Sequence, residues 1–356
     1  MSNCCIECFK DKYLREFIQL LSNSGDCDFC GRSNVALCDL NTAKYKELGL
    51  AISALINLYE VSSEDDSNSK LIKHALYDDW NVFNIIPDAI QKLIESEIIL
   101  DFVSNKELLF KPVIIPQRYD NDYLNENCIV RENNWKEFTE IIKYKNRFHS
   151  AAFNYDAFAS FISYSIKLYN KDDVMYRARI SSSDEVYGKN SMGVPPKVKR
   201  MAGRVNPDGI GVLYLASEPN TALSEVRASA FDFVTIGKFV AKQQVKLVDL
   251  SGLLSISPFS YESESALLNH AVNLGVLKDI VSDIAKPMRR SDSTLEYLPT
   301  QYIAELIKSE GYDGVEYKST IAKKGFNLAI FNEDLFECVN TYLIEVEELE
   351  YISRAI

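Results

Sequence analysis

The chain has 356 residues, of which 47% are hydrophobic and 25% charged, and it contains only 14 Gly and 10 Pro. This composition is typical of an ordered protein of two or three domains and excludes a largely disordered chain. The net charge of −12 argues against nucleic acid as a partner, because phosphate backbones are bound by concentrated Lys and Arg. No apolar run is long enough to span a bilayer, and the N-terminus lacks the apolar core of a signal peptide, so we expect a cytoplasmic protein with no membrane partner.

The N-terminal segment is rich in cysteine, with six of the eight cysteines between residues 4 and 38. Four of them form two C-x-x-C pairs separated by eighteen residues: Cys5 with Cys8, and Cys27 with Cys30. In a reducing compartment this spacing indicates zinc rather than disulfides, and a site filled by four thiolates leaves no position open for a reaction. We therefore predict a structural zinc, with Cys4 and Cys38 as alternative ligands.

Helical patterns dominate the chain as far as residue 170. Apolar residues recur at helical spacing in five segments: 10–21, 41–60, 86–98, 133–148 and 155–169. The first should join the two cysteine pairs, and from about residue 41 to 170 we expect a bundle of about five helices. His74 and His270 also fall in helical patterns, where we expect each to pack or to lie on the surface rather than to catalyse.

Strand patterns begin at residues 174–180 (VMYRARI), on which Arg177 and Arg179 share one face because strand side chains alternate. The segment 181–209 is polar and broken by Gly and Pro, and loops of this length inside a domain are usually functional. An anionic ligand of an acidic protein needs local positive charge, although an ordinary solvated loop explains the same residues equally well. The basic residues of this loop are Lys197, Lys199, Arg200 and Arg204.

One strand and two helices are predicted after this loop. Tyr214 lies midway along a short apolar strand. A helix that begins at PNTA (219–222) carries Glu225 at the flank of an apolar stripe through Ala222, Val226 and Ala230, so we expect it to continue past Glu225. A further helix begins near Pro299 and ends at Gly311, as the preference for Pro at helix starts and Gly at helix ends predicts.

Five blocks in this order resemble the RES domain family. They are YRARI, GRVNPDGIGVLYLA, TALSEVR, EYLPTQYIAELIKSEGYDGVEYKST and NLAIF, and they span roughly residues 174–335. The cysteine-rich segment and its helical sequel resemble the HEPN/RES N-terminal region found fused to such domains. HEPN ribonucleases carry a His four to six residues after an Arg, whereas Arg147 and His149 are only two apart, so we expect no nuclease site here.

The resemblance implies an α+β fold: an N-terminal zinc knuckle and helical bundle followed by a RES domain related to the ADP-ribosyltransferase fold. We expect three parts, a zinc knuckle over 1–40, a helical HEPN-like region over 41–170 and the RES domain over 171–356.

The resemblance also implies site residues. The catalytic set is Arg177, Tyr214 and Glu225, and the set that binds the cofactor is Arg204, Asn206 and Ser319. Arg179 competes with Arg177 for the first role and Tyr187 competes with Tyr214 for the second, while Val205 stands where the family usually has an aromatic residue. Paired donors suit an arginine to the pyrophosphate, and a carboxylate suits Glu225 to the charge that appears on the ribose.

The function implied is NAD degradation by cleavage of the nicotinamide N-glycosidic bond, as a glycohydrolase or a phosphorylase acting as a growth-arresting toxin or defence effector. NAD would be substrate rather than resident cofactor. The alternatives are an ADP-ribosyltransferase acting on a macromolecule and a non-catalytic nucleotide-binding or nucleic-acid-binding module. An antitoxin, restraint in cis by the N-terminal region, and a second copy of the chain are the partners to consider.

Overall fold

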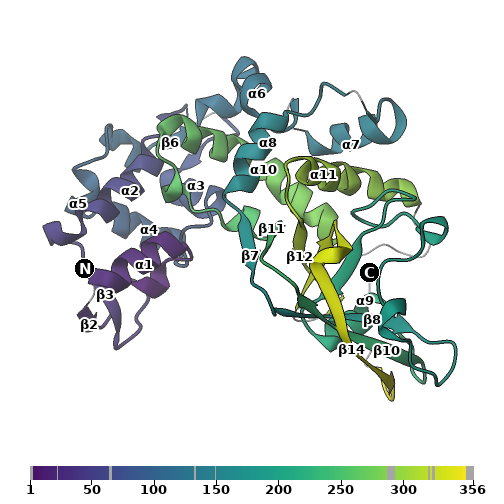
Figure 1. The fold of residues 1–356 in the computed structure, drawn as a ribbon. Coiled ribbons are helices and arrows are strands. Elements are labelled where there is room, and N and C mark those ends of the chain that lie inside the picture. Colours follow the sequence, from purple (N-terminus) through teal and green to yellow (C-terminus); the bar gives the residue numbers. More distant parts are fainter. Residues whose placement is uncertain are drawn as a thin grey trace. The chain divides into compact units, whose positions relative to one another are not determined.

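The computed structural model describes residues 3–21, 23–63, 66–131, 134–148, 150–286, 293–319, 321–322 and 325–349, so His149 lies outside the described residues. Its contacts divide the chain into two compact units. Unit 1 comprises residues 1–133 and 254–275, and unit 2 comprises residues 134–253 and 276–356. Helix α10 (Glu264–Ala285) therefore contributes to both (Figure 1).

Unit 1 is mainly helical and has two small antiparallel sheets. One sheet holds β1 (Asn3–Cys5), β3 (Val35–Asp39) and β2 (Asn23–Gly25) in that order, and the other holds β4 (Glu60–Val61), β6 (Pro112–Ile114) and β5 (Lys70–Leu71). Its remaining helices are α1 (Lys12–Leu21), α2 (Lys46–Ile56), α3 (Ile72–Asp79), α4 (Pro87–Ile94), α5 (Glu97–Leu100) and α6 (Asn121–Asn127). One apolar core runs from the buried cysteines to Leu267 and Ala271 of α10.

Unit 2 is built on an eight-stranded mixed sheet in the order β14-β10-β8-β9-β13-β12-β11-β7. In chain order its strands are β7 (Ile166–Tyr169), β8 (Val174–Ile180), β9 (Leu213–Ala216), β10 (Phe233–Ala241), β11 (Val245–Asp249), β12 (Gly314–Lys318), β13 (Phe326–Ile330) and β14 (Phe336–Glu345). Its helices are α7 (Trp135–Tyr144), α8 (Tyr155–Ser163), α9 (Pro219–Glu225), the end of α10, and α11 (Leu298–Ser309). The chain is thus a mixed helix and sheet protein, as the sequence predicts.

The sheet opens in its middle. β8 pairs with β10 over its whole length, but it meets β9 at one position, Tyr176 opposite Ala216. β9 pairs instead with β13. Side chains can therefore reach the space where β8 and β9 diverge.

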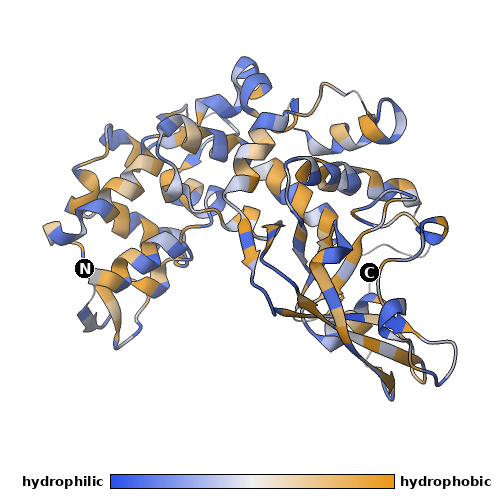
Figure 2. Cartoon of the chain, viewed as in Figure 1, coloured by the Kyte–Doolittle hydropathy of each residue, from blue (hydrophilic) through white to orange (hydrophobic). Residues whose placement is uncertain are grey.

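The two faces of this sheet are covered differently. On one face, α9 packs against β8 and β9 over a cluster of small residues that includes Ala178, Ala216 and Ala222. On the other, larger apolar residues such as Met175, Leu215 and Phe239 form a separate core. Apolar residues lie along the strands while the connecting loops are mostly hydrophilic (Figure 2). The small residues let α9 approach the sheet closely, which brings the end of the helix near the opening between the strands.

Three expectations are corrected at the level of single elements. The described helices between residues 41 and 170 are more numerous and shorter than a five-helix bundle, and a three-stranded sheet lies among them. The helix predicted over 155–169 ends at Ser163, because residues 166–169 pair with β11 as an edge strand. The helix predicted to continue past Glu225 ends there, because Arg227 adopts a left-handed conformation. The division at residues 40 and 170 stays a prediction.

Other expectations agree with the structure. α1 joins the two cysteine pairs, α4 begins at Pro87, and α11 is followed by Gly311 with a φ of 85°. His270 is buried, stacked on Trp80 and bonded through Nδ1 to the Tyr261 hydroxyl at 2.8 Å, so it packs as expected. Among the described residues, no helix is long and apolar enough to cross a membrane.

Candidate functional site

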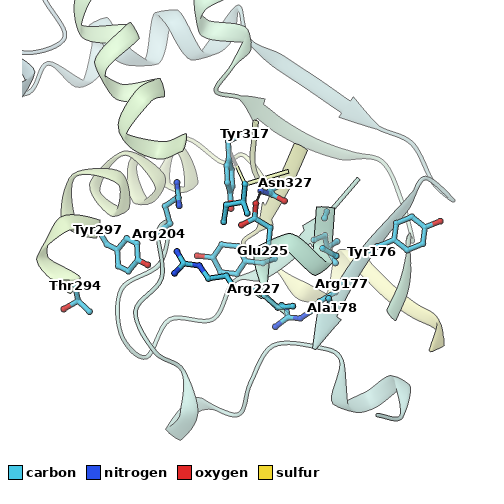
Figure 3. A pocket seen from close by; sticks show the side chains of 16 residues that line it. Tyr176, Arg177, Ala178, Arg204, Glu225, Arg227, Thr294, Tyr297, Tyr317 and Asn327 are labelled. Atoms are coloured by element: carbon cyan, nitrogen blue, oxygen red, sulfur yellow. Dashed lines mark hydrogen bonds between the residues drawn. The ribbon is translucent and has the colours of Figure 1, made fainter. Parts of the chain in front are cut away.

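A cavity of about 490 Å³ lies in unit 2 where β8 and β9 diverge (Figure 3). Its walls come from β8, β9, α9, β12, β13 and the segment that leads into α11. The ionisable and amide side chains that line it are Arg177, Arg204, Arg227, Glu225 and Asn327, together with the phenols of Tyr176, Tyr214, Tyr297 and Tyr317. Among the described residues, the cavity therefore gathers three guanidinium groups and one carboxylate.

Glu225, the last residue of α9, is held by two neutral donors. Its Oε1 accepts a hydrogen bond from the Ser319 hydroxyl at 2.8 Å and another from Asn327 Nδ2 at 2.7 Å. The described residues give Oε2 no hydrogen-bond partner. One oxygen is thus fixed by the protein, and the other is available to a ligand in the cavity.

Arg204 is placed by a loop that α11 supports. The Thr300 hydroxyl donates to the carbonyl of Arg204 at 2.5 Å, and Gln301 Nε2 donates to the carbonyls of Gly203 and Asn206 at 2.8 and 2.9 Å. The guanidinium donates to the carbonyl of Ile284 near the end of α10, where unpaired helix carbonyls attract cations.

The structure separates the two arginines of β8. Arg177 lines the cavity, and its Nη1 is buried with no hydrogen-bond partner among the described residues. Burial, reinforced by the nearby charge of Arg179, lowers the pKa of Arg177 to about 10. Arg179 instead lies over the ring of Tyr187 at 4.5 Å and donates to the carbonyl of Ser191 at 2.6 Å. Arg177 is therefore the member of the pair that a ligand could meet.

The two tyrosine candidates separate in the same way, because Tyr214 lines the cavity and Tyr187 does not. The Tyr214 hydroxyl donates to Asn206 Oδ1 at 2.7 Å and accepts from the amide of Val205 at 3.3 Å. Burial raises the pKa of Tyr214 to about 12, so the phenol keeps its proton. The ring faces the cavity wall while the hydroxyl braces the Arg204 loop.

Asn206 and Ser319 lie one step behind the cavity wall, since neither lines it. Asn206 Nδ2 donates to three loop carbonyls, those of Met201, Pro207 and Ile210. Ser319 is buried, and its hydroxyl donates to Glu225. Their observed bonds hold other site residues in place, and direct contact of either with a nucleotide stays a prediction.

The loop that precedes Arg204 has no room for a side chain at position 203. A Cβ at this position would lie 2.4 Å from Asn206 Oδ1 and 2.7 Å from the Tyr214 hydroxyl. Any larger residue would separate the side chains that shape the loop ahead of Arg204.

Residues 175–352 match the family model of the RES domain, half of the chain. The chain belongs to the RES domain family. None of the curated proteins compared with the chain matches it. Among solved structures, the M. tuberculosis MbcT–MbcA toxin–antitoxin complex is similar over 52% of this chain and 91% of its own, with 13% identity and a TM-score of 0.30. An anti-CRISPR protein is similar over 49% of this chain and 98% of its own, with 18% identity and a TM-score of 0.22.

Within the RES domain, several residues of the cavity wall could not be singled out from the sequence, among them Asn327, Tyr317, Tyr297 and Arg227. Asn327 lies in β13 and Tyr317 in β12, where the alternating apolar pattern makes them look like ordinary strand residues. Tyr297 precedes α11 and Arg227 follows α9. No spacing in the sequence links these positions, because each comes from a different element.

The four cysteines predicted to bind zinc precede the residues that match the RES domain, and the structure brings them together. The sulfur atoms of Cys5, Cys8, Cys27 and Cys30 lie within 4.8 Å of one another. Three separations, Cys5 to Cys8, Cys5 to Cys30 and Cys8 to Cys27, are 3.7, 3.4 and 3.5 Å. Zinc bonds of about 2.3 Å give a sulfur tetrahedron with edges of about 3.8 Å, so the donor set fits the metal. The amides of Phe29 and Cys30 also point at Cys27 Sγ, at 3.4 and 3.5 Å.

The two alternative ligands are excluded from this group. Cys4 and Cys38 face each other across β1 and β3, and the Cys38 thiol donates to the carbonyl of Cys4 at 3.3 Å. Both are buried beside the four-cysteine cluster without belonging to it.

Proposed function

We propose that this RES domain protein is an enzyme that breaks the bond between nicotinamide and ribose in NAD. The observation that carries the proposal is the Glu225 carboxylate, held at one oxygen by Ser319 and Asn327 in a cavity lined by three arginines. Family membership supports an NAD-related role.

Cleavage of the bond between nicotinamide and ribose is favoured by a carboxylate beside the ribose. When the C1′–N bond breaks, its electron pair leaves with nicotinamide, which becomes neutral, and positive charge appears on the ribose. An oxygen of the acceptor, water or inorganic phosphate, then bonds to C1′ and its proton passes to solvent. A carboxylate fixed beside that carbon stabilises the charge more strongly in the transition state than in bound NAD, which is the condition for catalysis.

The arginines supply the binding. A pyrophosphate carries two negative charges, and the planar guanidinium makes paired hydrogen bonds to phosphate oxygens. We assign Arg204 to the pyrophosphate because the carbonyl of Ile284 orients it toward the cavity wall. We assign Arg177 to the reacting end of the site because its buried Nη1 has no hydrogen-bond partner among the described residues. Tyr214 supplies an aromatic surface that can stack on the nicotinamide ring.

The test is incubation of the purified full chain with NAD, with and without inorganic phosphate, followed by mass spectrometry of the products. We expect free nicotinamide in both reactions. ADP-ribose identifies water as the acceptor, and ADP-ribose phosphate identifies phosphate. Intact NAD after incubation with folded, zinc-loaded protein would overturn the proposal, and ADP-ribose attached to protein would replace it with transfer to a macromolecule.

We further infer that the activity arrests growth by consuming cellular NAD. Expression of the wild-type chain should lower NAD and stop growth, whereas expression of the Glu225→Ala variant to the same level should do neither. Growth arrest by both proteins would separate toxicity from the cavity. Relief of the arrest by a co-expressed neighbouring gene product would identify an antitoxin as partner.

The cysteine cluster is proposed to hold one structural zinc. Four thiolates would complete its coordination, so the metal would stabilise unit 1 and take no part in the reaction. It joins a 3₁₀ turn that contains Cys8 to the hairpin that contains Cys27, two segments with little secondary structure of their own.

A further inference from the structure

Arg227 ends the helix that carries Glu225. The amide of Arg227 donates to the carbonyl of Ser224 at 3.1 Å, and the amide of Ala228 donates to the carbonyl of Leu223 at 3.4 Å. This pair of bonds is the Schellman arrangement, whose left-handed position is normally filled by Gly. Here it is filled by Arg227, with a φ of 53°.

A left-handed conformation is unfavourable for a residue with a Cβ, and such strain gathers at functional sites. Four described residues other than Gly have a positive φ, and of these only Arg227 lines the cavity. The others are Asn34, Asp172 and Phe231. Glycine would adopt this backbone conformation at position 227 with less strain. The presence of arginine instead indicates that its side chain has a role.

The charges around the cavity indicate what this side chain meets. Both hydrogen bonds described for the Glu225 carboxylate come from the neutral donors Ser319 and Asn327. The carboxylate is therefore not held by the arginines, and the described lining keeps an excess of positive charge. A lining of this kind favours an anionic ligand.

The position of Arg227 differs from that of Arg177. Arg177 is largely buried, whereas Arg227 is exposed although it lines the same cavity. Arg227 follows Glu225 by two residues, and Figure 3 shows the side chains of both among those that line the cavity.

We propose that Arg227 binds a phosphate of the substrate, so that a diphosphate is held between Arg204 and Arg227. The proposal rests on the function proposed above and adds its specificity: the site selects nucleotides that carry a diphosphate over nucleosides that carry none. Loss of a charged hydrogen bond should then weaken diphosphate binding about tenfold to a hundredfold. Binding of a nucleoside should not change.

The experiment is calorimetric titration of the full chain with ADP and with adenosine, beside thermal unfolding. Arg227→Gly and Arg227→Ala should both weaken ADP binding by that factor and leave adenosine binding unchanged. Only Arg227→Gly should raise the melting temperature, because only glycine relieves the left-handed backbone. Asp172→Gly is the matched control: it relieves the same strain at a φ of 72° away from the cavity, and should leave ADP binding unchanged.

The outcomes separate the two proposals. Unchanged ADP affinity in both Arg227 variants, or wild-type protein that does not bind ADP, would overturn the role of Arg227. Weaker ADP binding in the variants would support it even if the wild-type protein leaves NAD intact, a result that would overturn the proposed function alone. Weaker ADP binding only in Arg227→Gly would trace the effect to the backbone and also overturn the role.

Discussion

Asn327 donates a hydrogen bond from Nδ2 to Oε1 of Glu225 over 2.7 Å, although the two residues are 102 positions apart. The other amide atom of Asn327, Oδ1, is buried and has no hydrogen-bond partner among the described residues. Burying the Asn327 amide with one atom unpaired costs stability. The hydrogen bond that Asn327 makes to Glu225 therefore indicates that Asn327 positions the carboxylate.

The first prediction concerns this support of Glu225. Ser319→Ala and Asn327→Ala should each lower kcat about tenfold to a hundredfold with little change in KM, since each removes one hydrogen bond to a charged group that acts in the transition state. The double variant should fall short of the product of the two effects, because both bonds fix the same oxygen. Ser224→Ala is the control, since among the described residues the Ser224 hydroxyl bonds only the carbonyl of Asn220. Equal loss in the control would indicate damage to α9 instead.

The second prediction separates chemistry from binding. Glu225→Ala should lower kcat by orders of magnitude while NAD affinity stays within a few-fold, because the carboxylate acts on charge that exists only as the bond breaks. Arg204→Ala should chiefly raise KM, by the equivalent of about 1.5 to 3 kcal/mol, and Arg204→Lys should restore part of it. Steady-state nicotinamide release and calorimetry with NAD measure both. Near-normal turnover in Glu225→Ala would remove Glu225 from the mechanism, and Glu218→Ala at the other end of α9 serves as control.

The third prediction concerns the metal. Elemental analysis of undenatured protein should find one zinc per chain, and Cys27→Ser should lose it and unfold unit 1, since structural zinc supplies about 10 to 16 kcal/mol of apparent binding energy in small domains. Cys338→Ser, in β14, should keep both zinc and fold. Cys4→Ser and Cys38→Ser should retain zinc as well, because these cysteines lie outside the cluster. Metal-free wild-type protein that is fully folded would contradict the assignment.

The fourth prediction concerns acid stability. Burial lowers the pKa of His270 to about 4, against about 6.5 in an unfolded chain. The folded state therefore binds fewer protons than the unfolded state between these values, so the contribution of His270 to stability is complete above about pH 6.5 and is lost as the pH falls toward about 4. From about pH 7 to about pH 5 the wild type should lose about 2 kcal/mol more than His270→Gln, measured by denaturant unfolding. Equal losses in both proteins would show that His270 does not control this dependence.

The sequence by itself determined the features that depend on near neighbours along the chain. The two C-x-x-C pairs and the helix between them needed only their spacing. The strand at 174–180 and the short strand around Tyr214 needed only their local residue patterns. The same local information could not decide between Arg177 and Arg179, because alternation places both arginines on one face. It also could not decide between Tyr214 and Tyr187.

Tertiary structure decided what those local patterns could not. The single paired position between β8 and β9 creates the opening where Arg177 lines the cavity, while Arg179 lies over the ring of Tyr187. Residues 166–169 became a strand because β11 offers a partner, whatever their own helical pattern favours. The support of Glu225 and the placement of Arg227 also arise only when β13, β12 and the end of α9 meet, because hydrogen bonds and cavities join residues that are distant in sequence.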